Sequence, residues 1–139
     1  MLPMKRILLI DDDPFERTEV PNDLREFLSG DVEVTTAADA KQGIAEFQRL
    51  VQEKLHAVLL DFILDEGSMD DSIPLYRQML NEAPDVASSR VALRTSSREE
   101  HVRQWFQEAG VPFPPKYLGK GELREMLDWI NALPAQPES

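Results

Sequence analysis

The sequence predicts an α/β fold in which helices cover both faces of a parallel sheet, and three features lead to it. Short runs of consecutive aliphatic residues, such as 7–10 and 56–60, indicate strands that are buried on both faces. Stretches with apolar residues at helical spacing separate these runs, as crossover helices do in parallel sheets. Polar side chains follow the ends of several runs, which is where such folds place their sites.

Strands and helices are expected to alternate along the whole chain. The strands are expected at 7–10, 32–36, 56–60, 91–95 and 116–118, and the helices at 15–28, 40–51, 72–82, 98–109 and 123–130. Asp39 and Ser72 are expected to cap the second and third helices, and Pro21 to kink or break the first. A single domain over residues 1–139 is predicted, with its core at about 5–133 and a short C-terminal tail at 134–139.

Composition limits the classes of protein to consider. The 139 residues are 42% hydrophobic and 29% charged, an ordinary globular balance, and none is cysteine, which excludes disulfides and thiolate metal sites. No apolar run approaches the ~20 residues that span a membrane, and the N-terminus does not resemble a signal peptide, so a cytoplasmic protein is expected. The net charge of −11 argues against direct nucleic-acid binding and suits basic partners or metal ions.

Five polar residues are expected to converge at one edge of the sheet. Asp11 and Asp12 follow the first strand, Asp61 follows the third, Thr95 lies at the end of the fourth and Lys120 follows the fifth. Clustered carboxylates repel one another, and a divalent cation would offset that charge. Hard oxygen ligands in this number suit Mg²⁺, and the neighbouring hydroxyl and ammonium groups suit a phosphoryl group.

Four motifs in this order resemble the receiver domain of bacterial two-component response regulators. They are Ile-Asp-Asp-Asp-Pro at 10–14, Leu-Leu-Asp-Phe at 59–62, Leu-Arg-Thr-Ser at 93–96 and Tyr-Leu-Gly-Lys at 117–120. The resemblance covers nearly the whole chain, about Lys5 to Leu133. It implies a flavodoxin-like, doubly wound (βα)5 fold, a five-stranded parallel sheet with strand order 2-1-3-4-5.

The resemblance also implies a metal site at the end of the first strand. Asp11 and Asp12 match the family's acidic pair, with Asp12 the direct ligand of Mg²⁺. Asp61 and the backbone carbonyl of Ile63 would complete the protein's share of the metal shell.

The catalytic and switch residues implied by the resemblance lie on the other strands. Asp61 matches the phosphoacceptor, the nucleophile that takes a phosphoryl group from a phosphohistidine. Thr95 and Lys120 match the residues that bind the phosphoryl oxygens, and Thr95 and Tyr117 match the switch pair. Gly121 stands where the family usually has proline, and the segment 62–71 is unusually acidic.

The function implied is that of a stand-alone, chemotaxis-regulator-like response regulator in a phosphorelay. Its partners would be a sensor histidine kinase or a histidine phosphotransfer protein, and then an unidentified downstream protein. Its catalysis would be limited to phosphotransfer onto its own Asp61 and to autodephosphorylation, without a metabolic substrate. No nucleic acid or membrane insertion is expected, and a homodimer is permitted.

Two alternatives remain open at this stage. A phosphorylation-independent adaptor with a receiver fold is favoured only by Gly121. A phosphohydrolase resembling the haloacid dehalogenases would use Asp11 as its nucleophile, although the chain lacks that family's late acidic metal motif and cap domain. The nucleophile discriminates between receiver and hydrolase: Asp61 in the first, Asp11 in the second.

Overall fold

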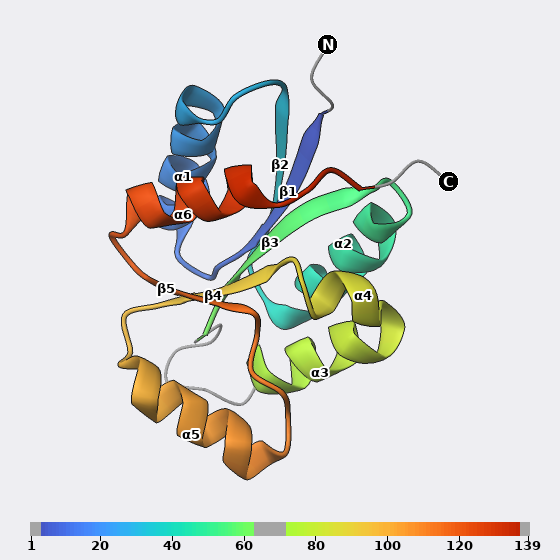
Figure 1. Ribbon diagram of the computed structural model, residues 1–139, viewed down its shortest axis with the longest axis vertical. Coiled ribbons are helices and arrows are strands. Elements are labelled where there is room, and N and C mark those ends of the chain that lie inside the picture. The colour runs from blue at the N-terminus through green and yellow to red at the C-terminus, as the bar shows by residue number, and fades with distance from the viewer. Residues whose placement is uncertain (1–3, 63–71, 137–139) are drawn as a thin grey trace.

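The computed structural model describes residues 4–62 and 72–136, and its chain path is drawn in Figure 1. The strands are β1 (Lys5–Ile10), β2 (Val32–Ala37), β3 (Leu55–Asp61), β4 (Val91–Thr95) and β5 (Lys116–Gly119). The helices are α1 (Pro14–Phe27), α2 (Ala40–Val51), α3 (Ser72–Glu82), α4 (Pro84–Ala87), α5 (Glu99–Ala109) and α6 (Leu123–Ala132). Across these ranges no helix is both long and apolar enough to span a bilayer.

The described strands form one parallel sheet in the order β2-β1-β3-β4-β5, as predicted. The central strand β3 pairs with β1 on one side and with β4 on the other, so that Ile10 lies opposite Leu60 and Asp61 lies opposite Arg94. This register brings the carboxyl ends of β1, β3 and β4 to the same edge of the sheet.

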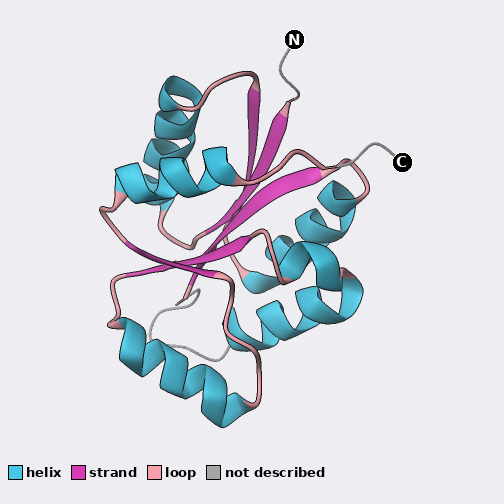
Figure 2. Cartoon of the chain, in the orientation of Figure 1, coloured by secondary structure: helices cyan, strands magenta, loops and turns pink. Residues whose placement is uncertain are grey.

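Helices cover both faces of the sheet (Figure 2). Successive residues of a strand point to opposite faces, so Leu8 and Ile10 pack with α2, α3 and α5, whereas Ile7 and Leu9 pack with α1 and α6. Every residue of β3 is buried. Burial of both faces explains why the central strands carry unbroken aliphatic runs.

Three local predictions need correction. The predicted single helix before β4 is followed by a second short one, α4, in which Pro84 occupies the first turn, because proline fits where the backbone N–H has no helical partner. The predicted break at Pro21 is wrong, since helix α1 continues through this residue, and the predicted kink stays a prediction. Ser72 is the buried first residue of α3, and its hydroxyl donates to backbone carbonyls of the β3 end. The predicted cap Asp39 is confirmed, since its carboxylate accepts from the Gln42 N–H at 2.8 Å.

Polar contacts tie the C-terminal segment to the opposite edge of the sheet. The ring Nε2 of His56 donates to the Ile130 carbonyl at 2.9 Å, and burial lowers the pKa of this histidine. Arg90 donates to the carbonyls of His56 and Pro134, and the Gln136 amide donates to the Leu55 carbonyl. The chain after α6 is therefore held against the sheet as far as Gln136.

Candidate phosphoryl and metal site

Four parallel strands deliver the predicted polar residues to one edge of the sheet. Asp11 follows β1 directly, Asp61 is the last residue of β3, Thr95 is the last residue of β4 and Lys120 follows β5. The side chains arrive together because parallel strands end at the same edge, which is where doubly wound folds bind their ligands. The predicted location of these residues at the ends of the strands is confirmed.

Three carboxylates form a compact cluster at this edge. Ligand atoms of Asp11, Asp12 and Asp61 all lie within 4.8 Å of one another. Asp11 is fully buried and Asp61 is 4% exposed, whereas Asp12 is more open to solvent. Carboxylate oxygens held this closely, with one member open to water, fit a hard divalent cation such as Mg²⁺ that keeps several water ligands.

One oxygen of the Asp11 carboxylate has no hydrogen-bond donor among the described residues. Its Oδ1 accepts from the Asp13 N–H at 2.9 Å. Its Oδ2 is buried and finds no hydrogen-bond partner in the described part of the chain. An unsatisfied buried carboxylate oxygen is costly, and a bound cation or its water would satisfy it.

Lys120 supplies a positive charge to the same cluster. Its Nζ lies 3.4 Å from Asp61 Oδ1 and 3.9 Å from Asp11 Oδ2. Its own backbone N–H donates to the Thr95 carbonyl at 3.1 Å, which anchors the loop to β4. Gly121 follows at a φ of 95°, a conformation that proline cannot adopt and that glycine adopts freely.

Burial and mutual repulsion perturb both buried carboxylates. The pKa of Asp61 is raised to about 7, first by burial and then by the charge of Asp11, while Lys120 pulls it back down. Burial also raises the pKa of Asp11, against the Asp13 N–H and the charges of Lys120 and Arg94. A further cation beside such a carboxylate would stabilise its ionised form and lower its pKa.

Thr95 and Tyr117 are linked through one intervening residue. The Thr95 hydroxyl is buried and accepts from the Ser97 N–H at 3.1 Å. The Tyr117 hydroxyl donates to the Ser97 carbonyl. The two predicted switch residues thus hold the same loop after β4, which is a contact that the sequence did not reveal.

Three residues support the site in ways that the sequence analysis did not predict. Asp13 caps α1 by accepting from the Phe15 N–H at 2.9 Å, which fixes the turn that carries Asp11 and Asp12. Ser72 binds the Asp61 carbonyl at 2.8 Å. Arg94 lies inside the Leu-Arg-Thr-Ser motif, where a charged residue in an otherwise buried strand was the available signal.

Two predictions lie outside the described residues. They are the metal-binding carbonyl of Ile63 and the acidic stretch after Phe62, since the structure does not describe residues 63–71.

No protein-family model matches the chain, and no curated protein matches it. Many solved structures do. A CheY-like response regulator receiver domain from Methanospirillum hungatei JF-1 has 24% identity and a TM-score of 0.67, with 92% of this chain and 91% of that chain covered. The non-phosphorylated HemR receiver domain from Leptospira biflexa has 20% identity and a TM-score of 0.68, with 97% and 99% covered. The Mn²⁺-bound form of response regulator Rcp1 has 23% identity and a TM-score of 0.60, with 94% and 99% covered.

The strand order and the acidic edge together define a doubly wound α/β protein with three clustered carboxylates that could hold a metal ion at the carboxyl ends of its strands. Its fold is that of the CheY-like receiver domains of response regulators, over more than nine tenths of the chain.

Proposed function

We propose that this chain is a response regulator that accepts a phosphoryl group on Asp61. The observation that carries the proposal is the position of Lys120, whose ammonium group lies between the carboxylates of Asp61 and Asp11 within the three-carboxylate cluster. A cation there can neutralise a phosphoryl oxygen as the group transfers. The receiver-domain fold supports the same reading.

In the proposed transfer, an ionised Asp61 oxygen attacks the phosphorus of a phosphohistidine. A P–O bond forms, the P–N bond breaks, and the imidazole nitrogen leaves with the electron pair and then takes up a proton. Lys120 and the Thr95 hydroxyl would bind two phosphoryl oxygens. In its contact with Ser97 the Thr95 hydroxyl only accepts, so its own O–H is available to donate to a phosphoryl oxygen. Attack of water on the acyl phosphate would regenerate the free carboxylate.

Mg²⁺ is the proposed cofactor. Asp11, Asp12 and Asp61 would hold it, with Asp12 as a direct ligand, and the carbonyl of Ile63 is proposed as a further ligand. The metal would supply positive charge to the transferring phosphoryl group. The Mn²⁺-bound form of the structurally similar Rcp1 is consistent with a divalent cation in this fold.

The proposed partners are proteins. A sensor histidine kinase or a histidine phosphotransfer protein would donate the phosphoryl group, and a downstream protein would read the phosphorylated surface in the cytoplasm. The net charge of −11 disfavours direct contact with nucleic acid. Thr95 and Tyr117 would form the switch because both contact Ser97.

The test is incubation with Mg²⁺ and acetyl phosphate, followed by mass spectrometry to locate an acid-labile phosphoryl group. We expect modification at Asp61, and its complete loss in Asp61→Asn, which is nearly isosteric but has no nucleophilic carboxylate. Circular dichroism should show that the variant stays folded.

Each other outcome identifies an alternative. A phosphoryl group on Asp11 would indicate the hydrolase mechanism. A protein that binds Mg²⁺ but stays unmodified, both by acetyl phosphate and by phosphorylated histidine phosphotransfer proteins, would indicate an adaptor.

A further inference from the structure

A second cation, Arg94, reaches the acidic cluster from inside the sheet. It is the residue of β4 that lies opposite Asp61 on β3. Its guanidinium NH1 lies 3.7 Å from Asp11 Oδ2, the oxygen that finds no hydrogen-bond partner among the described residues. Arg94 is only 8% exposed, so its charge is poorly screened by solvent.

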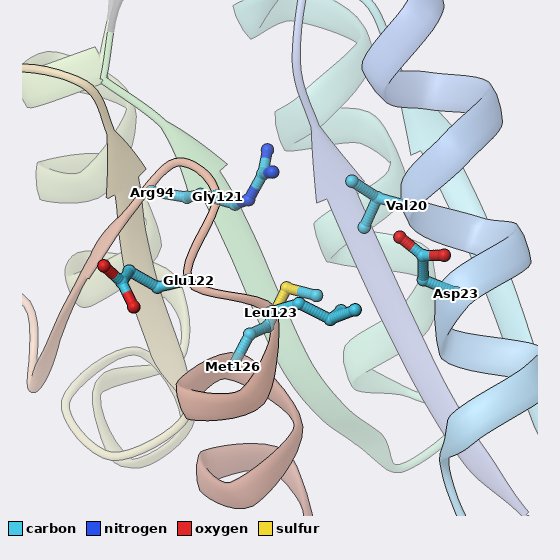
Figure 3. A pocket seen from close by; sticks show the side chains of 7 residues that line it. All are labelled: Val20, Asp23, Arg94, Gly121, Glu122, Leu123 and Met126. Atoms are coloured by element: carbon cyan, nitrogen blue, oxygen red, sulfur yellow. The ribbon is translucent and has the colours of Figure 1, made fainter.

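Glu16 on α1 forms an ion pair with this guanidinium, whose NH1 makes no hydrogen bond to the described residues. Its Oε2 lies 3.0 Å from Arg94 NH1, and its side chain is 20% exposed. Arg94 also lines a cavity of about 90 Å³, together with Val20 and Asp23 of α1. Figure 3 shows these side chains. The arginine therefore spans from β4 to α1 directly beside the carboxylate cluster.

We propose that Arg94, positioned by Glu16, is the internal counter-ion of Asp11 and sets the metal affinity of the site. Without metal it partly neutralises the buried carboxylate. With metal its charge opposes the incoming cation, so it weakens metal binding. Arg94 is thus a positioning residue, which acts through Asp11 rather than by contact with the phosphoryl group.

The physical reason is the balance of charges. When all three are ionised, Asp11, Asp12 and Asp61 bring three negative charges, and Lys120 alone would leave two of them uncompensated. Arg94 adds a buried positive charge within 4 Å of one carboxylate. Coulomb energies at this range exceed thermal energy even at an effective dielectric constant of about 20. Removing the charge of Arg94 should therefore raise the affinity of the cluster for a cation.

The experiment is calorimetric titration of the full chain with MgCl₂ at constant ionic strength. We expect Arg94→Met to bind Mg²⁺ about three- to tenfold more tightly than the native protein, as removal of one nearby charge predicts. Arg94→Lys keeps the charge and should stay close to native affinity. Arg90→Met is the matched control, because Arg90 is a similarly buried arginine whose hydrogen bonds within the described residues go to backbone carbonyls at the other edge of the sheet.

A second readout needs no metal. In EDTA, Arg94→Met should lower the urea midpoint of unfolding of the native protein. It should lower the midpoint less when Asp11→Asn is also present, because the Asp11 charge that Arg94 neutralises is then already absent. Additive effects of the two substitutions would overturn the counter-ion role. Unchanged or weaker Mg²⁺ binding by Arg94→Met, or an equal gain in Arg90→Met, would overturn the effect on metal affinity.

This inference rests on the proposed function for the identity of the cation, but the two can fail separately. Phosphorylation of Asp61 with native Mg²⁺ affinity in Arg94→Met would refute only the inference. Tighter Mg²⁺ binding in Arg94→Met, with Asp61 left unphosphorylated by every donor, would refute only the proposed function.

Discussion

At Asp61, burial and the neighbouring Asp11 disfavour the charged form, while Lys120 favours it. Burial is the largest of the three effects, and the pKa is raised to about 7. The proposed nucleophile is therefore only partly ionised near neutral pH unless another cation is present. This links the reactivity of the residue to the metal that the cluster fits.

The raised pKa predicts how the stability of the metal-free protein depends on pH. A carboxyl group with a folded pKa above its unfolded value of 3.8 contributes stability at acidic pH and loses it as the pH rises. The contribution of Asp61 to the free energy of unfolding should therefore fall between about pH 4 and pH 7. Urea unfolding in EDTA across this range measures it, with Asp61→Asn as the comparison.

In Asp61→Asn the same range should show a smaller fall in stability with rising pH, because the titrating group is absent. Identical pH profiles for both proteins would contradict the raised pKa. Saturating Mg²⁺ should also flatten the native profile, since a bound cation favours the charged carboxylate.

Asp12 offers a separate test of the metal site. Mg²⁺ should raise the melting temperature of the native protein, because a ligand at about 100 times its Kd stabilises the folded state by about 2.7 kcal/mol. Asp12→Ala should lose most of this shift. The partly open position of Asp12 makes the substitution mild for the fold itself. Differential scanning fluorimetry with and without Mg²⁺ measures the change in melting temperature. An Mg²⁺-dependent change as large in Asp12→Ala as in the native protein would show that the metal binds elsewhere.

At the scale of elements, helix α2 sets the position of β1 through a close approach at Gly43. A Cβ built at Gly43 would lie 2.9 Å from Ile10 Cδ1 and 3.1 Å from its Cγ2. Ile10 is fully buried and directly precedes Asp11. Glycine at this position therefore allows the helix to pack against the strand that carries the acidic pair.

Gly43→Ala should lower the free energy of unfolding by up to about 2 kcal/mol. Alanine gains about 1 kcal/mol of helix propensity, but overpacking a rigid, β-branched core residue costs about 1–3 kcal/mol and also strains the neighbouring strand. Denaturant unfolding measures the change. Adding Ile10→Val should recover part of the loss, and a stabilised single variant would show that the helix shifts without cost.

At the scale of the whole molecule, two contact paths lead from the site to its surface. One runs from Thr95 through Ser97 to Tyr117. The other runs from Phe62, the residue after Asp61, to Trp105 on α5, whose rings stack with centroids 5.5 Å apart and planes 2° apart. Both paths reach the face formed by β4, α5 and β5.

Binding of the phosphoryl mimic beryllofluoride with Mg²⁺ should therefore change amide hydrogen exchange between Arg94 and Ile130. A ligand shifts the conformational equilibrium only by its differential affinity for the two states, so a modest change is expected. Asp61→Asn is the control, since it removes the oxygen to which beryllium binds. Unchanged exchange at a saturated site would refute the switch and leave phosphoryl shuttling as the function.

The strands and most helices could be predicted because their signals are local. Unbroken aliphatic runs in β1 and β3 require burial on both faces, and Asp39 carries the capping chemistry of α2 in its own side chain. The site residues Asp11, Asp61 and Lys120 could be placed because each lies at or directly after the end of a strand, and parallel strands end together. The resemblance of four ordered motifs supplied their proposed roles.

The partners of Ser72, Arg94 and Gly43 could not be predicted from the sequence. Ser72 carries a helix-capping signal, but tertiary contacts turn its hydroxyl toward the β3 end. Arg94 finds Asp11 and Glu16 only because the register between β3 and β4 places it there. Patterns along the chain fix which residues are buried and where strands end, because these depend on neighbours in sequence. Pairings between charges and close approaches depend on distances across the sheet, which only the tertiary structure decides.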